Sequence, residues 1–247
     1  MSCDAVISDW NGTIIDYRDE KPVLEAVAAG LFRKSVPFHP LRMARILKAR
    51  RDLEALYSEK RRDGDFDFVR EMFRVYNRRV ISGLPVSLIH ATVEEYARKS
   101  ETQARLDLRL LRVLRECHEK QMCTGIFSAG FRYGIESILG LAGYRRYFDF
   151  CEADDLEVND GRAVGFPLRI YQNKPALLTS LLADRGLDPS RTAYIGDSED
   201  DEGCFEIVRF PVVPFVAPED VKETYARKYH AFVPRSEQEL RDYLVRA

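Results

Sequence analysis

Apolar and polar positions alternate along the chain with two different periods, and each period predicts a different kind of element. Residues 3–8 form a short apolar run that ends at Asp9 and is broken by Asn11-Gly12, so we expect a buried strand with a loop at its carboxyl end. From residue 106 onward the pattern predicts helices and strands in turn, which is typical of a parallel sheet covered by helices on both faces. The helices are expected at 106–117, from Phe131, at 173–185 and at 200–208, and the strands at 122–127, 147–151, 192–196 and 212–216.

The segment from about residue 20 to residue 104 carries an almost wholly helical pattern. Pro22 and Pro40 open two of its runs, as is common in the first turn of a helix. The expected helices span 22–34, 40–62, 66–80 and 86–99. We therefore expect a Rossmann-like α/β core with a doubly wound parallel sheet, formed by residues 1–15 and 105–247, and a helical cap formed by residues 16–104. Within the core, Asn159-Asp160-Gly161 predicts a hairpin over 156–166, and residues 235–246 predict a closing helix.

The composition narrows the class of protein. With 45% hydrophobic and 32% charged residues, the chain has the composition of a soluble globular protein. No apolar run approaches the roughly 20 residues needed to cross a bilayer. The start, MSCDAVISDW, lacks the basic segment and apolar stretch of a secretory signal peptide. We expect a cytoplasmic protein with no membrane partner, either a monomer or a homodimer.

Charge and cysteine usage exclude two further classes of function. The formal net charge of −2 argues against a nucleic-acid binder, because such proteins neutralise phosphates with an excess of Lys and Arg. The five cysteines are far apart and form no C-x-x-C pair, which disfavours disulfides and a zinc site. The four histidines show no metal-ligand spacing either. The informative signals are therefore local.

Polar side chains gather where three of the expected strands end, and a lysine opens the helix before the third. Taken singly, each of these residues is more often a helix cap, a turn residue or a solvated side chain. In parallel sheets, however, ligands bind beyond the carboxyl ends of the strands, so the joint occurrence indicates a site. The segments are Ser8-Asp9-Trp10-Asn11-Gly12-Thr13, Ser128-Ala129-Gly130 and Gly196-Asp197-Ser198-Glu199-Asp200-Asp201, and the lysine is Lys174.

Together these segments resemble the four motifs of the haloacid dehalogenase superfamily: D-x-D-x-T, a Ser or Thr after the second motif strand, a Lys at a helix start, and an acidic G-D-x-x-x-D cluster. The resemblance implies a phosphatase-like enzyme whose Asp9 attacks phosphorus and forms an aspartyl-phosphate. It also implies Mg²⁺, bound by Asp9, the backbone carbonyl of Asn11 and Asp197, because the cation lets a carboxylate approach a phosphate dianion. In the same scheme Lys174 neutralises the transferring group. The remaining expected roles are phosphoryl binding by Thr13, Ser128, Ala129 and Gly130, and support of the metal waters or of Lys174 by Asp201, with Asp200 as its alternative.

The sequence departs from the phosphatase pattern at Asn11, where the family has a second Asp that acts as general acid and base. An amide cannot exchange a proton near neutral pH, and general acid–base catalysis is worth about 10²–10⁴-fold. We therefore expect hydrolysis to suffer at this step. Metal binding should survive, because the expected ligand at this position is a backbone carbonyl.

Two branches of the superfamily share further residues with this chain. The start D-W-x-G-T followed by Ile14-Ile15-Asp16-Tyr17 resembles the phosphonatase branch, in which a cap lysine forms a Schiff base, and Lys48 lies at a suitable distance downstream. A solvated basic helix face is the commoner explanation of Lys48. The core resembles the phosphoserine phosphatase branch, but that branch has a substrate-binding Glu where this chain has Arg18. Phosphoserine is therefore not carried over as a substrate.

Three hypotheses of function follow from these residues. The first is a phosphohydrolase or phosphotransferase that acts on a small phosphorylated or otherwise anionic metabolite through Asp9. The second is cleavage of a carbon–phosphorus bond with Lys48 as the imine-forming amine. The third is a phosphate-binding regulatory protein that has lost turnover because of Asn11.

Overall fold

The structure is a computed structural model that describes residues 3–17, 21–36, 38–60 and 66–246. The chain folds into two compact units. We call them the core unit, Met1–Glu20 with Arg98–Asp154 and Arg169–Ala247, and the helical unit, Lys21–Ala97 with Asp155–Leu168. The expected boundaries at 15/16 and 104/105 lie close to the first two of these divisions.

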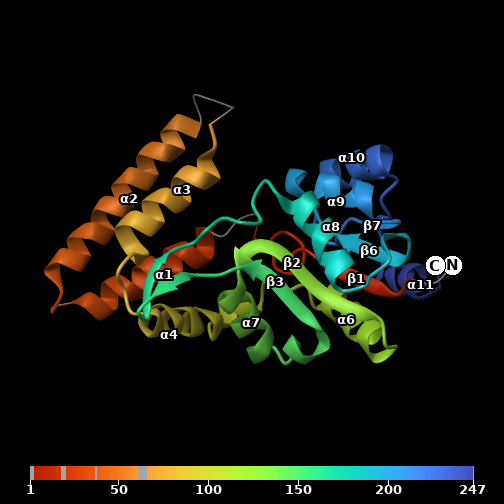
Figure 1. Cartoon of the computed structure of the whole chain (residues 1–247), viewed down its shortest axis with the longest axis horizontal. Helices are drawn as coiled ribbons and strands as arrows, with labels where there is room; N and C mark the ends of the chain where they lie inside the picture. The colour runs from red at the N-terminus through yellow and green to blue at the C-terminus, as the bar shows by residue number, and fades with distance from the viewer. Residues whose placement is uncertain (1–2, 18–20, 37, 61–65, 247) are drawn as a thin grey trace. The chain divides into compact units, whose positions relative to one another are not determined.

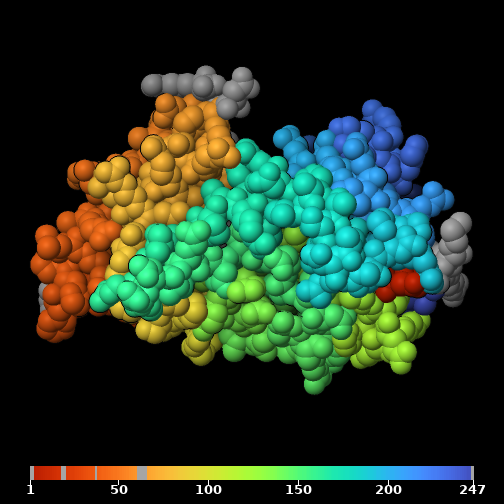
Figure 2. Space-filling view, in the orientation of Figure 1, coloured from red at the N-terminus to blue at the C-terminus, as the bar shows by residue number. Residues whose placement is uncertain are grey.

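The core unit is built on a five-stranded parallel sheet in the order β3-β2-β1-β6-β7. Every residue of β1 is buried, as expected for a central strand of a parallel sheet that is covered on both faces. In Figure 2 the red N-terminal segment is visible only as a small patch on the surface. The strands are β1 (Ala5–Ser8), β2 (Cys123–Phe131), β3 (Phe150–Asp154), β6 (Thr192–Ile195) and β7 (Phe210–Val212).

Helices cover the faces of this sheet, as the alternating pattern predicted (Figure 1). Helix α6 begins at a capping carboxylate, because Asp107 accepts hydrogen bonds from the backbone N–H groups of Arg109 and Leu110. Buried side chains such as Phe127, Leu178 and Phe205 fill the space between sheet and helices. The helices are α5 (Ser100–Gln103), α6 (Leu108–Glu119), α7 (Arg132–Leu141), α8 (Lys174–Asp184), α9 (Glu202–Ile207), α10 (Glu219–Tyr229) and α11 (Glu237–Arg246), with short 3₁₀ turns at Arg145–Tyr147, Pro189–Arg191 and Glu199–Asp201.

The helical unit contains the four helical runs that the sequence predicted, with one change. The run expected over 66–80 is α3 followed by one π-helical turn, η1, which widens the helix before Ser82. The elements are α1 (Lys21–Ser35), α2 (Pro40–Lys60), α3 (Phe68–Tyr76), η1 (Asn77–Ile81) and α4 (Val86–Ala97).

The predicted hairpin is present but belongs to the helical unit, whereas the sequence placed it with the core. Its strands β4 (Glu157–Asn159) and β5 (Arg162–Gly165) pair in antiparallel fashion. The side chain of Asn77 in η1 both donates to the carbonyl of Phe166 (3.0 Å) and accepts the N–H of Phe166 (2.9 Å). A backbone bond from Val86 to the carbonyl of Gly161 adds to this attachment. Figure 2 shows the hairpin in green against the side chains of the helical unit.

Two further elements differ from the sequence expectation. The last strand is Phe210–Val212 and not 212–216; directly after it, the backbone N–H of Val213 donates to the carbonyl of Phe232 and not to a strand of the sheet. Helix α10 was not predicted, since its apolar positions are sparse among charged residues. Among the described residues, none of the helices has the length and apolar character that crossing a membrane requires.

Candidate active site

The site lies where the three middle strands of the core sheet end, since β2, β1 and β6 are neighbours. Asp9 directly follows β1, and the loop after it is a tight turn in which the backbone N–H groups of Ile14 and Ile15 both donate to the carbonyl of Trp10. Gly12 has a φ of +70°, and a Cβ at this position would lie 2.2 Å from Oδ2 of Asp197. Glycine is therefore required here both by the backbone and by the neighbouring carboxylate.

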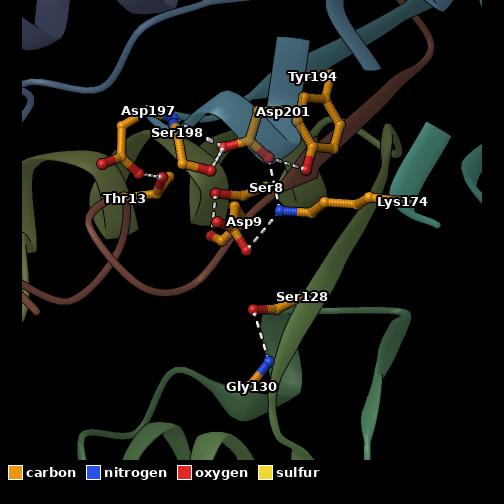
Figure 3. Close-up of polar contacts among 10 residues, drawn as sticks. All are labelled: Ser8, Asp9, Thr13, Ser128, Gly130, Lys174, Tyr194, Asp197, Ser198 and Asp201. Atoms are coloured by element: carbon orange, nitrogen blue, oxygen red, sulfur yellow. Dashed lines mark hydrogen bonds and ion pairs between the residues drawn. The ribbon is translucent and has the colours of Figure 1, made fainter. Parts of the chain in front are cut away.

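Lys174 joins two carboxylates at the centre of the site (Figure 3). Its Nζ lies 3.1 Å from Oδ1 of Asp9 and 2.6 Å from Oδ1 of Asp201. All three side chains are buried. Burial alone would lower the pKa of Lys174, but the two carboxylates outweigh it and hold the pKa above the ordinary value of a lysine. Lys174 is therefore a fixed positive charge beside Asp9.

Asp201 is held by hydrogen bonds on both carboxylate oxygens. Its Oδ2 accepts the backbone N–H groups of Asp197 and Ser198, each at 3.0 Å, and the Ser198 hydroxyl at 2.9 Å. Its Oδ1 accepts the hydroxyl of Tyr194 at 2.7 Å as well as Lys174. Burial would raise the pKa of Asp201, yet Lys174 and these donors keep it below the usual value. Asp201 therefore orients Lys174 and the loop around Asp197.

Asp197 completes the acidic group. The Thr13 hydroxyl donates to its Oδ1 at 3.0 Å. Burial and the nearby Asp9 and Asp201 raise the pKa of Asp197 to about 7. Burial raises the pKa of Asp9 to about 6, although the Lys174 ammonium lowers it by more than the Asp201 carboxylate raises it.

The geometry of the acidic group suits a divalent cation. Carboxylate oxygens of Asp9, Asp197 and Asp201 all lie within 4.8 Å of one another. Lys174 supplies one positive charge against these three carboxylates, and the pKa values of Asp9 and Asp197 are raised accordingly, which favours protons on these two groups where no further positive charge is present. A hard cation that prefers oxygen ligands would replace those protons. Since Asp201 is already saturated by donors, Asp9 and Asp197 are the available pair.

Ser128 lies on the opposite side of Asp9 from the acidic group (Figure 3). Its buried hydroxyl accepts the N–H of Gly130 at 3.2 Å. A register shift between Ser128 and Phe131 bends the end of β2 at this point, so that Ala129 and Gly130 leave the regular ladder. The segment lies at the carboxyl end of β2, beside Asp9, and its role in anion binding stays a prediction.

Three other candidate residues lie on the loop after β1, on the 3₁₀ turn after β6 and on α2. Asn11 is half-buried in the turn after Asp9, and Asp200 is half-buried in the 3₁₀ turn but does not belong to the carboxylate group. Lys48 is exposed on α2 of the helical unit. Arg18 lies outside the described residues.

Sequence reasoning missed the contributions of Tyr194 and Ser198. Tyr194 is fully buried in β6 and reaches Asp201 with its hydroxyl, while its ring lies 5.8 Å from Nζ of Lys174. A tyrosine in an apolar strand gives no sign of this contact, except that a buried tyrosine needs a hydrogen-bond partner. Ser198 forms a capping box with Asp201, and its spacing three residues before an acidic residue was the available signal.

Several solved structures share the fold over nearly the whole chain. A structure of phosphoserine phosphatase with bound substrate aligns with a TM-score of 0.57 and 14% identity, covering 99% of this chain and 99% of its own. A phospho-aspartyl intermediate analogue of phosphoserine phosphatase gives 0.56 and 14%, covering 99% and 100%. A HAD family hydrolase from Salmonella enterica serovar Typhi gives 0.64 and 18%, covering 99% and 72%. No curated protein matches the chain.

The family follows from the sequence itself. The profile of the haloacid dehalogenase-like hydrolases matches residues 6–206, which include Asp9, Ser128, Lys174 and Asp201. This match extends over more than half of the chain, and the parallel sheet agrees with it. The chain therefore belongs to the haloacid dehalogenase-like hydrolase family.

Proposed function

We propose that this hydrolase is a Mg²⁺-dependent phosphohydrolase or phosphotransferase that acts on a small phosphorylated metabolite through an aspartyl-phosphate on Asp9. The observation that carries the proposal is the buried Asp9 carboxylate, fixed 3.1 Å from the Lys174 ammonium and grouped with Asp197. A carboxylate held this way is positioned by its partners and can attack an incoming phosphorus atom.

Each neighbouring residue has a role in this scheme. Lys174 offsets negative charge on the transferring phosphoryl group, and Asp201 holds Lys174 in place. Ser128 and the backbone N–H groups after it offer hydrogen bonds to phosphoryl oxygens, and Thr13 orients Asp197. Asp9, Asp197 and the Asn11 carbonyl would hold Mg²⁺, which would neutralise the repulsion between Asp9 and a phosphate dianion.

The structural relatives support this chemistry. One of them is a phospho-aspartyl intermediate analogue of phosphoserine phosphatase, so that relative uses a carboxylate as a phosphoryl carrier on the same fold. The identity of 14% carries the fold and not the substrate. Arg18 stands where the phosphoserine phosphatase branch has a substrate-binding Glu, so we do not extend phosphoserine to this chain.

Asn11 determines what happens after the first step. Formation of the aspartyl-phosphate needs a nucleophile and charge neutralisation, and Asn11 can still donate a hydrogen bond to the leaving oxygen. Hydrolysis of the intermediate needs a base to deprotonate water, which an amide cannot provide. The intermediate should therefore persist longer than in relatives with Asp, which favours transfer to another acceptor or a regulatory role.

The Schiff-base alternative is not supported by the surroundings of its lysine. An imine-forming lysine is usually activated by desolvation or by another nearby cation. Lys48 is exposed on α2, with no such desolvation in the helical unit. Incubation with a phosphonate-derived aldehyde and borohydride would leave a stable adduct on Lys48 if this alternative operated.

One set of assays tests the proposal. Phosphate release from a panel of phosphorylated metabolites is measured in Mg²⁺ for the wild type, Asp9→Asn and Asn11→Asp, with Asp184→Asn on the exposed end of α8 as a matched control. We expect Asp9→Asn to abolish activity, the control to retain it, and Asn11→Asp to raise hydrolysis by about 10²–10⁴-fold. Activity that survives Asp9→Asn would refute the assignment of the nucleophile.

A further inference from the structure

The helical unit contains an elongated apolar groove of about 700 Å³ that has no part in the chemistry above. Helices α1 and α2 form its two walls, and α3 and η1 form its floor. The three helices are labelled in Figure 1. All residues around the groove belong to the helical unit: Lys21, Leu24, Glu25, Ala28, Ala29, Phe32, Arg33, Ile46, Leu47, Ala49, Arg50, Leu53, Glu54, Tyr57, Met72, Tyr76 and Val80.

The groove exists because small side chains stand where the two walls face each other. Leu24, Ala28 and Phe32 follow one another at intervals of four residues and so lie on one face of α1. Ala28 on this face and Ala49 on α2 border the groove with short side chains. The volume of about 700 Å³ lies within the roughly 300–1,000 Å³ of small-molecule sites, which are also mostly apolar.

The floor of the groove is fastened to one wall. Tyr76 of α3 is buried, and its hydroxyl accepts the backbone N–H of Ala28 in α1 at 3.2 Å. Burial raises the pKa of Tyr76 far above its usual value, so the phenol stays neutral. The groove is therefore largely preformed in the folded unit, as expected of a binding site.

The charges on the described residues around the groove are paired at all positions but one. Lys21 lies 3.8 Å from Glu25 and over the ring of Tyr57, and Arg50 bonds to Glu54 at 3.1 Å. Arg33, at the other end of the α1 wall from Lys21, forms no ion pair with any carboxylate in the described part of the chain. The groove therefore has an apolar interior and, within that part of the chain, one uncompensated positive charge at one end.

We propose that this groove binds a linear apolar monoanion, of the class of a medium-chain alkanoate, with its carboxylate at Arg33 and its chain along α1 toward Leu24. These two residues are nine positions apart on α1, which corresponds to about 13 Å of helix. An extended alkyl chain fits, and its single negative charge matches Arg33.

The proposal is tested by calorimetric titration of the full-length protein with dodecanoate below its micelle concentration. We expect saturable binding of one dodecanoate per chain. Loss of a charge-assisted hydrogen bond in Arg33→Gln should weaken binding about tenfold. Arg51→Gln is the matched control, because Arg51 is exposed on α2 and does not border the groove. Ala28→Leu, which fills the groove with a good helix former, should also weaken binding at least tenfold.

Three results of the titrations would overturn the proposal. They are no binding of dodecanoate by the wild type, equal affinity of the wild type and Arg33→Gln, and equal affinity for dodecyltrimethylammonium, which would indicate unspecific apolar adsorption. A concentration-dependent dimer that Ala28→Leu abolishes would assign the groove to a second copy of the chain instead. Circular dichroism melting of each variant shows whether a loss of binding comes from loss of the fold.

Discussion

Replacing a proposed metal ligand should make the metal-free protein more stable. The perturbation is Asp197→Asn. The pKa of Asp197 is raised from an ordinary value of 3.8 to about 7, because the carboxylate is buried beside Asp9 and Asp201. The difference between these two pKa values corresponds to about 4 kcal/mol of unfavourable interaction in the ionised form. Asparagine carries no charge and can still accept the hydrogen bond from Thr13.

The sign of the effect depends on pH. A carboxyl group whose pKa is higher in the folded state than in the unfolded state binds more protons when folded, so its contribution to stability is complete below about pH 4 and is lost as the pH rises through about 7. Asp197→Asn should therefore raise the free energy of unfolding at pH 8 by up to about 4 kcal/mol and leave it nearly unchanged near pH 4.

The assay is denaturation by urea in the presence of EDTA, followed by circular dichroism, for wild type, Asp197→Asn and the surface control Asp184→Asn. Mg²⁺ should stabilise the wild type at pH 8 and have little effect on Asp197→Asn, because binding to the folded state stabilises it by mass action. If Asp197→Asn proves less stable than the wild type at pH 8 without metal, the carboxylates do not repel one another as described.

Three other predictions concern the same site. The affinity of the protein for Mg²⁺ should rise between about pH 5 and pH 8, because the metal displaces protons from Asp9 and Asp197, whose pKa values are about 6 and about 7. Calorimetry in two buffers of different ionisation enthalpy would show this proton release. Absence of proton release would contradict the cation site. Tyr194→Phe removes one hydrogen-bond donor from Asp201 and should lower the free energy of unfolding by about 1–2 kcal/mol, measured by urea denaturation. It should also lower kcat, measured by phosphate release. An unchanged kcat would leave the tyrosine a purely structural role. Gly12→Ala should abolish Mg²⁺ binding in calorimetry, since its Cβ would lie 2.2 Å from Oδ2 of Asp197, and unaltered binding would show that the loop can adjust.

The sequence predicted the location of the site because it depends on topology. Strand ends in a parallel sheet meet at one edge, so Asp9, Ser128 and Asp197 could be placed together from the positions of their strands alone. The lysine could be added because it begins a helix that follows the same edge. These residues are joined by the hydrogen bonds of Asp201 to Tyr194 and to the loop after β6. Such bonds depend on side-chain directions, which the hydrophobic periodicity does not predict.

The parts that the sequence did not predict have physical causes of the same kind. The hairpin at 156–166 could be recognised from its turn, but its place in the helical unit depends on the Asn77 amide, which bonds to Phe166 at a distance of 89 residues in the chain. The π-helical turn after Tyr76 and the helix α10 are set by packing against neighbours. Local pattern thus predicts elements better than their partners.

The most direct test of the central claim is to trap the phosphoryl group on the protein. The wild type is incubated with acetyl phosphate and Mg²⁺, quenched and reduced with borohydride, which converts an aspartyl-phosphate into homoserine, and the peptides are examined by mass spectrometry. We expect homoserine at residue 9, in an amount that approaches one per chain because Asn11 slows hydrolysis, and none in Asp9→Asn. Modification at another residue, or an unmodified Asp9 in the wild type, would contradict it.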